Sequence, residues 1–357
     1  MFFSLESGRK SFLNQSIGLE TEWKVWYTSL RVRTEEKRFQ MKKKQRNLRI
    51  LWIAFCLLFV FVGALATYDK IMIKTEADKI IPNGQMVNLG EYSVHVFTDG
   101  DNTEDPTLVF LSGSATVAPV YDFKSLYRLL ASAYRIAVVE KAGYGYSDIV
   151  DVERDVASMV EEVRSALSLS GIKGSYVLLP HSMSGLEALY WAQQYPEEIA
   201  GIVGLDMSVP YSYDELDLSI AGRMITLGRL SKMLGLLRIP GIYSVNESPL
   251  TESEVKQQRM LIHRNAVNSV YIAEGNAVYD NAQIVKAGGK VSCPILMFCS
   301  DGTEIGDFWI PTQKQFAEES HAELILFDCG HYLHYYESDR MATSIQAFVE
   351  GLPRAHT

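Results

Sequence analysis

Ser182 is the residue in this chain best placed to act as a nucleophile. It lies in the stretch LLPHSMSGL, directly after an apolar run that predicts a buried strand and directly before a predicted helix over 184–194. Such a strand-to-helix turn lies at the carboxyl end of a strand, where open α/β sheets bind their ligands. The sequence therefore predicts that Ser182 faces a binding site.

A serine needs a general base to become reactive, and His331 is the predicted base. It follows the last predicted strand in the loop CGHY, and loops at the carboxyl ends of neighbouring strands converge in space. His181 is adjacent to Ser182, but successive side chains at a strand end diverge, so we expect it to pack or hydrogen-bond nearby. His334, three residues after His331, stays open as an alternative base.

A carboxylate is then required to orient the imidazole and to stabilise its protonated form. Asp301 ends the apolar run PILMFCSD, next to the last predicted strand, and is the predicted acid. Asp206, which ends the run GIVGLD, is the alternative acid, and Glu304 is a third candidate.

Two backbone N–H groups are predicted to stabilise an oxyanion. One belongs to Met183, at the start of the helix after the nucleophile, and the other to Ser114, in the turn LSGSATVAP. Neither a Walker pattern nor G-x-G-x-x-G is present, which argues against a phosphate site. The four cysteines show no C-x-x-C or His-rich spacing, so we predict free thiols and no metal.

The segments that position these residues alternate between short apolar runs and helical patterns. Runs that are apolar throughout and separated by helices predict a parallel sheet that is buried on both faces. Residues 209–290 interrupt the alternation with helical material alone, which predicts a lid. The predicted strands after an initial hairpin are 107–113, 135–143, 176–182, 201–208, 294–301 and 323–328.

These features together resemble the α/β-hydrolase fold family. PHSMSG resembles its G-H-S-M-G-G elbow, EKAGYGYSD its D-R-P-G-Y-G-x-S-D segment, and GHYLHYYESD its G-H-x-x-H-x-E-x-P-E loop. The order Ser182, Asp301, His331 is the family's order of nucleophile, acid and base. Over residues 85–353 the resemblance implies an α/β fold with a mostly parallel sheet of about eight strands, and a lid between the sixth and seventh.

The resemblance also implies a reaction without a cofactor: hydrolysis of an ester, thioester, amide or related bond through a covalent acyl-enzyme. Pro180 and Ser184 depart from the family pattern, because they stand where the elbow usually has glycines. The dehalogenase and epoxide-hydrolase branches carry aspartate at the position of Ser182, which argues against their chemistries here. An acyltransferase or a non-catalytic binding protein on the same scaffold are the alternatives.

The amino-terminal part predicts a membrane anchor. Residues 50–68 form a run of nineteen residues without a charge or a proline, close to the length that crosses a bilayer. Residues 1–49 carry 12 Lys/Arg against 5 Asp/Glu, which predicts a basic cytoplasmic segment, a single-pass protein of the cell membrane and an extracytoplasmic hydrolase domain over 69–357. A cleaved signal peptide, suggested by Ala64-Leu65-Ala66, is the alternative, and Met41 begins a compact basic start that suggests residues 1–40 are an extension.

The net charge of residues 50–357 argues against one class of partner. Residues 50–357 carry 22 Lys/Arg against 38 Asp/Glu, so no nucleic-acid partner is predicted. A small-molecule or lipid-like acyl substrate is predicted instead.

Overall fold

One sheet of eight strands organises the computed structural model, which describes residues 5–216, 218–242 and 246–353. The strand order is β1-β2-β4-β3-β5-β6-β7-β8. The pairs β1/β2 and β2/β4 are antiparallel and the other pairs are parallel. The bounds are β1 Gln85–Asn88, β2 Ser93–Asp99, β3 Thr107–Leu111, β4 Ile136–Glu140, β5 Tyr176–Pro180, β6 Ile199–Leu205, β7 Ile295–Cys299 and β8 Glu323–Leu326.

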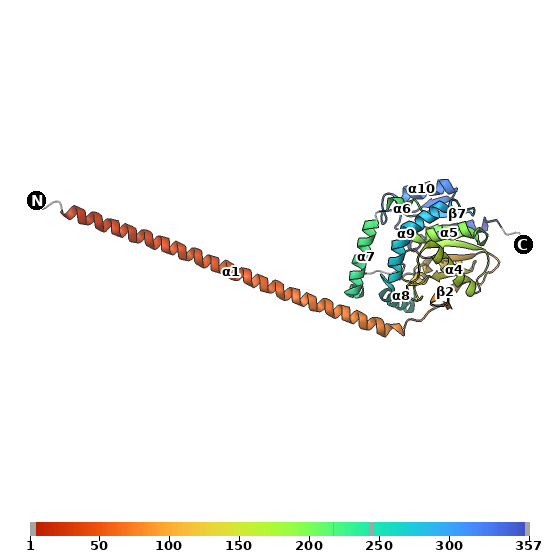
Figure 1. The fold of residues 1–357 in the computed structure, drawn as a ribbon, viewed down its shortest axis with the longest axis horizontal. Helices are drawn as coiled ribbons and strands as arrows, with labels where there is room; N and C mark the ends of the chain where they lie inside the picture. The colour runs from red at the N-terminus through yellow and green to blue at the C-terminus, as the bar shows by residue number, and fades with distance from the viewer. Residues whose placement is uncertain (1–4, 217, 243–245, 354–357) are drawn as a thin grey trace. The chain divides into compact units, whose positions relative to one another are not determined.

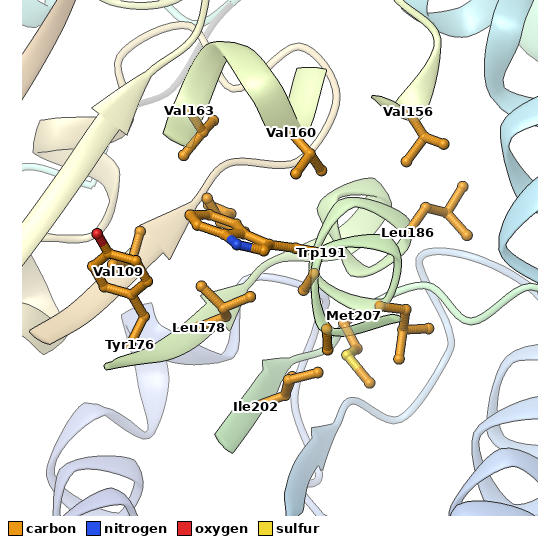
Figure 2. Packing of buried hydrophobic residues seen from close by; sticks show 14 of the residues in the cluster. Val109, Val156, Val160, Val163, Tyr176, Leu178, Leu186, Trp191, Ile202 and Met207 are labelled. Carbon is orange, nitrogen blue, oxygen red and sulfur yellow. The ribbon is translucent and has the colours of Figure 1, made fainter. Parts of the chain in front are cut away.

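Helices cover both faces of this sheet. Side chains alternate along each strand, so Val109 and Leu111 of β3 pack in one core cluster while Leu108 and Phe110 pack in the other. Figure 2 shows Trp191 between Val160 and Val163 of one helix and the strand residue Leu178. The helices outside the lid are α2 Pro119–Asp122, α3 Lys124–Leu130, α4 Val156–Leu169, α5 Gly185–Gln194, α10 Trp309–Ser320, α11 Leu333–Tyr336 and α12 Ser338–Glu350, with short 3₁₀ turns η1 Ser182–Ser184 and η2 Pro196–Glu198.

The segment between β6 and β7 is helical and contains no strand among its described residues, 209–216, 218–242 and 246–294. In Figure 1, α9 lies between α7 and the rest of the domain. Thr251 begins α8 with a capping box, and Asn268 begins α9 by accepting hydrogen bonds from Val270 N–H and Tyr271 N–H. The bounds are α6 Ser212–Glu215, α7 Leu218–Met233, η3 Leu236–Arg238, α8 Glu252–Asn265 and α9 Ser269–Gly288.

The chain divides into two compact units, residues 1–64 and residues 65–357. Helix α1 (Leu5–Ala77) makes up the described part of the first unit, and its last turns belong to the second. This helix is long and apolar enough to cross a membrane. Residues 1–4 of the predicted basic segment lie outside the described residues.

Candidate active site

Ser182 lies in a strained turn between β5 and α5. Its φ angle is +54°, a left-handed conformation that is uncommon for a residue with a side chain. The turn η1 begins at Ser182 itself, so the chain leaves the strand and enters the helix within one residue. Strain of this kind is retained where the surrounding packing holds a functional side chain in place.

Two glycines let other backbone segments approach this turn. A Cβ atom on Gly113 would lie 2.6 Å from Cβ of Ser182, and one on Gly185 would lie 2.2 Å from the carbonyl oxygen of Ser208. Gly185, which matches the last glycine of the G-H-S-M-G-G pattern, therefore has no room for a side chain. The Ser184 side chain is accommodated, and its hydroxyl oxygen lies 2.8 Å from the carbonyl oxygens of both Leu111 and His181, between which its one proton is shared.

Pro180 is accommodated by a gap in the strand pairing. The register of β5 with β6 runs to the pair Leu178 and Ile202, and resumes at an isolated bridge between His181 and Leu205. Pro180 pairs with Leu111 of β3 and lies in the gap on the β6 side, so β5 continues to the turn although proline has no N–H. The departure from the family's glycine is thus compatible with an intact turn.

His331 is paired with Asp206. Its Nδ1 atom lies 2.6 Å from Oδ2 of Asp206, whose side chain is fully buried. The other carboxylate oxygen accepts hydrogen bonds from Ser300 N–H at 2.8 Å and from the indole N–H of Trp309 at 2.7 Å. An ionised carboxylate in this position accepts the Nδ1–H of the imidazole and leaves Nε2 free to accept a proton.

The structure places Asp206, the alternative acid, and not the predicted Asp301, beside the His331 ring. The carboxylate of Asp301 accepts hydrogen bonds from the N–H and hydroxyl of Thr303, at 2.8 and 2.7 Å. Glu304, the third candidate, accepts the backbone N–H of His331 at 2.8 Å and so holds the loop rather than the ring. Asp206 reaches the imidazole because it turns out of β6 with a φ angle of +51°.

His181 and His334, the two histidines near His331 in this site, pack beside its loop. Nε2 of His181 lies 3.2 Å from the carbonyl oxygen of His331, and their rings are 4.6 Å apart between centroids. Burial holds the pKa of His181 well below its usual value and lowers the pKa of His334 to about 3, so both rings are neutral. His334 packs against Phe123 and His181, and it does not line the cavity that contains Ser182.

The N–H groups of Ser114 and Met183 are available as donors. Neither donates a hydrogen bond within the described ranges 5–216, 218–242 and 246–353. Ala115, next to Ser114, has a φ angle of +58°, which makes this turn sharp. Both N–H groups belong to residues that line the same cavity as Ser182.

That cavity has a volume of about 600 Å³ and lies between the carboxyl ends of the strands and the lid. Ser182 and His331 both line it, while Asp206 lies behind His331. Its remaining walls are mostly apolar, and none of its lining residues within the described chain is Asp, Glu, Lys or Arg. Among the residues that the structure describes, no group of three or more His, Cys, Asp or Glu side chains could hold a metal ion.

Comparison with known proteins agrees with this architecture. The family model described as "alpha/beta hydrolase fold" matches residues 106–234. An uncharacterized protein, YbdG of Bacillus subtilis strain 168, is 30% identical over 315 residues, which cover 84% of this chain and 96% of YbdG. The chain belongs to the α/β-hydrolase fold family. The predicted family and fold class are therefore confirmed.

Solved structures of this family share the fold at low sequence identity. Haloalkane dehalogenase DbeA from Bradyrhizobium elkani matches with a TM-score of 0.53 and 16% identity, over 75% of this chain and 97% of DbeA. Epoxide Hydrolase A from Mycobacterium thermoresistibile matches with a TM-score of 0.54 and 14% identity, over 76% of this chain and 99% of that protein. A hydrolase is the kind of enzyme that this α/β-hydrolase fold supports.

Trp309 is the residue of this α/β-hydrolase site that the sequence did not reveal. Its indole is buried, donates to Asp206, and lies edge-on to the His331 ring with centroids 5.9 Å apart. A tryptophan between a strand and a helix is a weak signal, although a buried indole N–H usually has an acceptor.

The segment EKAGYGYSD joins loops to the end of β4. Its first residue, Glu140, accepts hydrogen bonds from the N–H groups of Val120 and Tyr146, at 3.1 and 2.7 Å.

Proposed function

We propose that this protein is a membrane-anchored serine hydrolase that cleaves an ester or related acyl bond. Ser182 is the nucleophile, His331 the base and Asp206 the acid, with the N–H groups of Ser114 and Met183 as oxyanion donors. The observation that carries the proposal is the 2.6 Å distance between Nδ1 of His331 and Oδ2 of the buried Asp206. His331 also lines the same cavity as Ser182, whose backbone conformation is strained.

The reaction follows from these roles. The Ser182 hydroxyl attacks the acyl carbon while Nε2 of His331 takes its proton, and Asp206 stabilises the resulting imidazolium. The negative charge that develops on the acyl oxygen is stabilised by the two free N–H groups. The imidazolium protonates the leaving alcohol as the ester bond breaks, and a water molecule activated by the same histidine then hydrolyses the acyl-enzyme.

The cavity supports an uncharged, apolar acyl or alcohol group as the part of the substrate that it binds. Residues from three elements form its apolar wall: Ile225 of α7, Ile272 and Val278 of α9, and Phe308 before α10. A site of about 600 Å³ lies within the range of small-molecule pockets. A charged group buried there would find no opposite charge among the described lining residues except a protonated His331.

The anchor part of the proposal is supported by α1. Its apolar residues 50–68 match the thickness of a bilayer core, and the excess of Lys and Arg before them favours a cytoplasmic amino terminus. The hydrolase domain would then work outside the cytoplasm, beside the membrane.

Active-site labelling tests the catalytic proposal. The full-length chain, purified in detergent, is treated with a fluorophosphonate probe and assayed on p-nitrophenyl esters of increasing acyl length. We expect the probe on Ser182 by peptide mass spectrometry, and loss of labelling and ester hydrolysis in Ser182→Ala. Ser184→Ala is the matched control, because it removes a neighbouring buried hydroxyl whose hydrogen bonds are to backbone carbonyls.

Two results separate the alternatives. A folded chain whose Ser182 does not react would contradict the enzyme and favour a binding protein. A chain that labels at Ser182 but transfers the acyl group to an added alcohol faster than to water would favour an acyltransferase.

A further inference from the structure

Helix α7 of the lid is apolar on two sides. On one side Ile225 and Gly228 pack against Gly275 of α9 and Val267. The other side carries four large apolar residues that the domain leaves uncovered: Met224, Leu227, Leu230 and Met233, which are 64%, 59%, 46% and 62% exposed. An uncovered group of four large apolar side chains on one helix indicates contact with a second apolar phase.

The charge of the α7 segment is opposite to that of the body. Residues 218–246 carry four basic residues, Arg223, Arg229, Lys232 and Arg238, and no Asp or Glu. Residues 50–357 as a whole have an excess of acidic residues. Basic residues beside exposed leucines and methionines are the composition of helices that lie in the interface of an anionic membrane.

The segment directly after α7, Gly235 and η3, contacts the last turns of α1. Gly235, in a left-handed conformation with a φ angle of +70°, lies so close to Leu65 that a Cβ atom would be 2.8 Å from the Leu65 carbonyl oxygen. Arg238 donates to Oδ1 of Asp69 at 2.7 Å, and to both oxygens of Glu76, each at 2.7 Å. Leu65 lies within the predicted membrane span, so these contacts join the lid to the end of the span itself.

We propose that the exposed face of α7 docks on the outer surface of the bilayer that α1 spans. The apolar side chains enter the boundary between headgroups and acyl chains, and the exposed Arg229 contacts anionic headgroups. This inference rests on the membrane anchor of the proposed function. It commits to the lipid bilayer as the occupant because the charge of the segment and its attachment to the span both point there.

Docking on this face bears on how substrate reaches Ser182. Met224 belongs both to the exposed face and to the lining of the cavity, and Gly222 and Ile225 line the cavity beside it. A lipid-like ester can then pass from the bilayer to the nucleophile along α7 without crossing water.

Amide hydrogen exchange on the full-length chain in nanodiscs tests the docking. Discs of phosphatidylcholine are compared with discs that also contain phosphatidylglycerol, and exchange is followed in peptides from 222–233. We expect slower exchange in the discs with phosphatidylglycerol. Arg229→Gln should speed exchange there by roughly fivefold, the contribution of one basic side chain near an anionic surface, and have little effect in phosphatidylcholine alone.

Leu227→Glu and Leu169→Glu form a matched pair, because the two leucines are 59% and 60% exposed on different helices. We expect Leu227→Glu to speed exchange in 222–233 and Leu169→Glu to leave it unchanged. Equal effects of the two variants, or equal wild-type exchange in the two kinds of disc, would overturn the docking. Recovery of the chain with the discs tests the anchor, and labelling of Ser182 tests the hydrolase, so each failure is recognised separately.

Discussion

Replacing Asp206 by asparagine tests the geometry on which the proposed mechanism depends. The amide has the shape of the carboxylate, and its oxygen can keep accepting from Ser300 N–H and the Trp309 indole. Its NH₂ group then replaces Oδ2 and faces Nδ1 of His331, now 2.6 Å away. Because an NH₂ group donates, the imidazole must carry its own proton on Nε2 and cannot accept the proton of Ser182.

The expected loss in kcat is about 10⁴-fold, the effect of the wrong histidine tautomer in a serine triad, and it corresponds to about 5.5 kcal/mol of activation free energy. The assay is the steady-state hydrolysis of the best p-nitrophenyl ester, together with the rate of fluorophosphonate labelling. Thermal unfolding checks that the variant keeps its fold.

Asp301→Asn is the matched control, because Asp301 follows the neighbouring strand and its carboxylate contacts Thr303 instead of His331. It should keep activity close to wild type. The double variant Ser182→Ala, Asp206→Asn should lose no more than Ser182→Ala alone, since residues that act as a unit are not additive. The reasoning is refuted if Asp301→Asn loses several orders of magnitude while Asp206→Asn keeps most of its activity.

Three further predictions follow from contacts outside the catalytic pair. Gly113→Ala should lower kcat/KM by about 100-fold because its methyl group would displace the nucleophile, whereas Gly351→Ala, with room for the methyl group, should keep wild-type ester hydrolysis. Burial raises the pKa of Asp122 from 3.8 to about 7, so the folded chain holds a proton there that the unfolded chain releases. The stability that depends on this proton, at most about 4 kcal/mol, is lost as pH rises from about 4 to 7. Urea unfolding across this pH range should show a smaller loss for Asp122→Asn. Glu274→Gln breaks a buried ion pair of α9 and should lower the free energy of unfolding by about 3 to 5 kcal/mol. Asp214→Asn breaks an exposed pair with Lys286 of α9 and should lower it by under about 1 kcal/mol; equal losses would contradict the assignment.

The strands could be predicted closely because the inner ones, β3 to β7, are mainly apolar and are buried along almost their whole length. The run 176–182 contains β5 (Tyr176–Pro180), and 323–328 contains β8 (Glu323–Leu326). Burial on both faces leaves no polar position inside such a strand, so its ends coincide with the first polar or turn residues. The predicted runs nevertheless extended two or three residues past the carboxyl ends of the strands, into the turns, and the run 201–208 began two residues after the start of β6.

The acid could not be chosen from the sequence because both candidates follow adjacent strands. Leu205 of β6 pairs with Phe298 of β7, so Asp206 and the residues just before Asp301 leave the sheet side by side. The choice is made by backbone conformation and by Trp309, which is distant from Asp206 in the chain. Neither a left-handed φ angle at an aspartate nor a donor from another element has a signature in local sequence.

The two long helices between β6 and β7 that line the cavity, α9 and α7, are held to the domain in different ways. Glu274 of α9 accepts hydrogen bonds from two nitrogens of Arg154, at 3.1 and 2.8 Å, in a fully buried cluster that also contains Lys141. Separating α9 from the domain would expose or unpair these charges, which costs several kcal/mol. Helix α7 meets α9 where Ile225 packs against Gly275, away from the buried cluster of Glu274. Movement of α7 would therefore leave the buried cluster of Glu274 intact, and the segment after α7 contacts the last turns of α1 through Arg238.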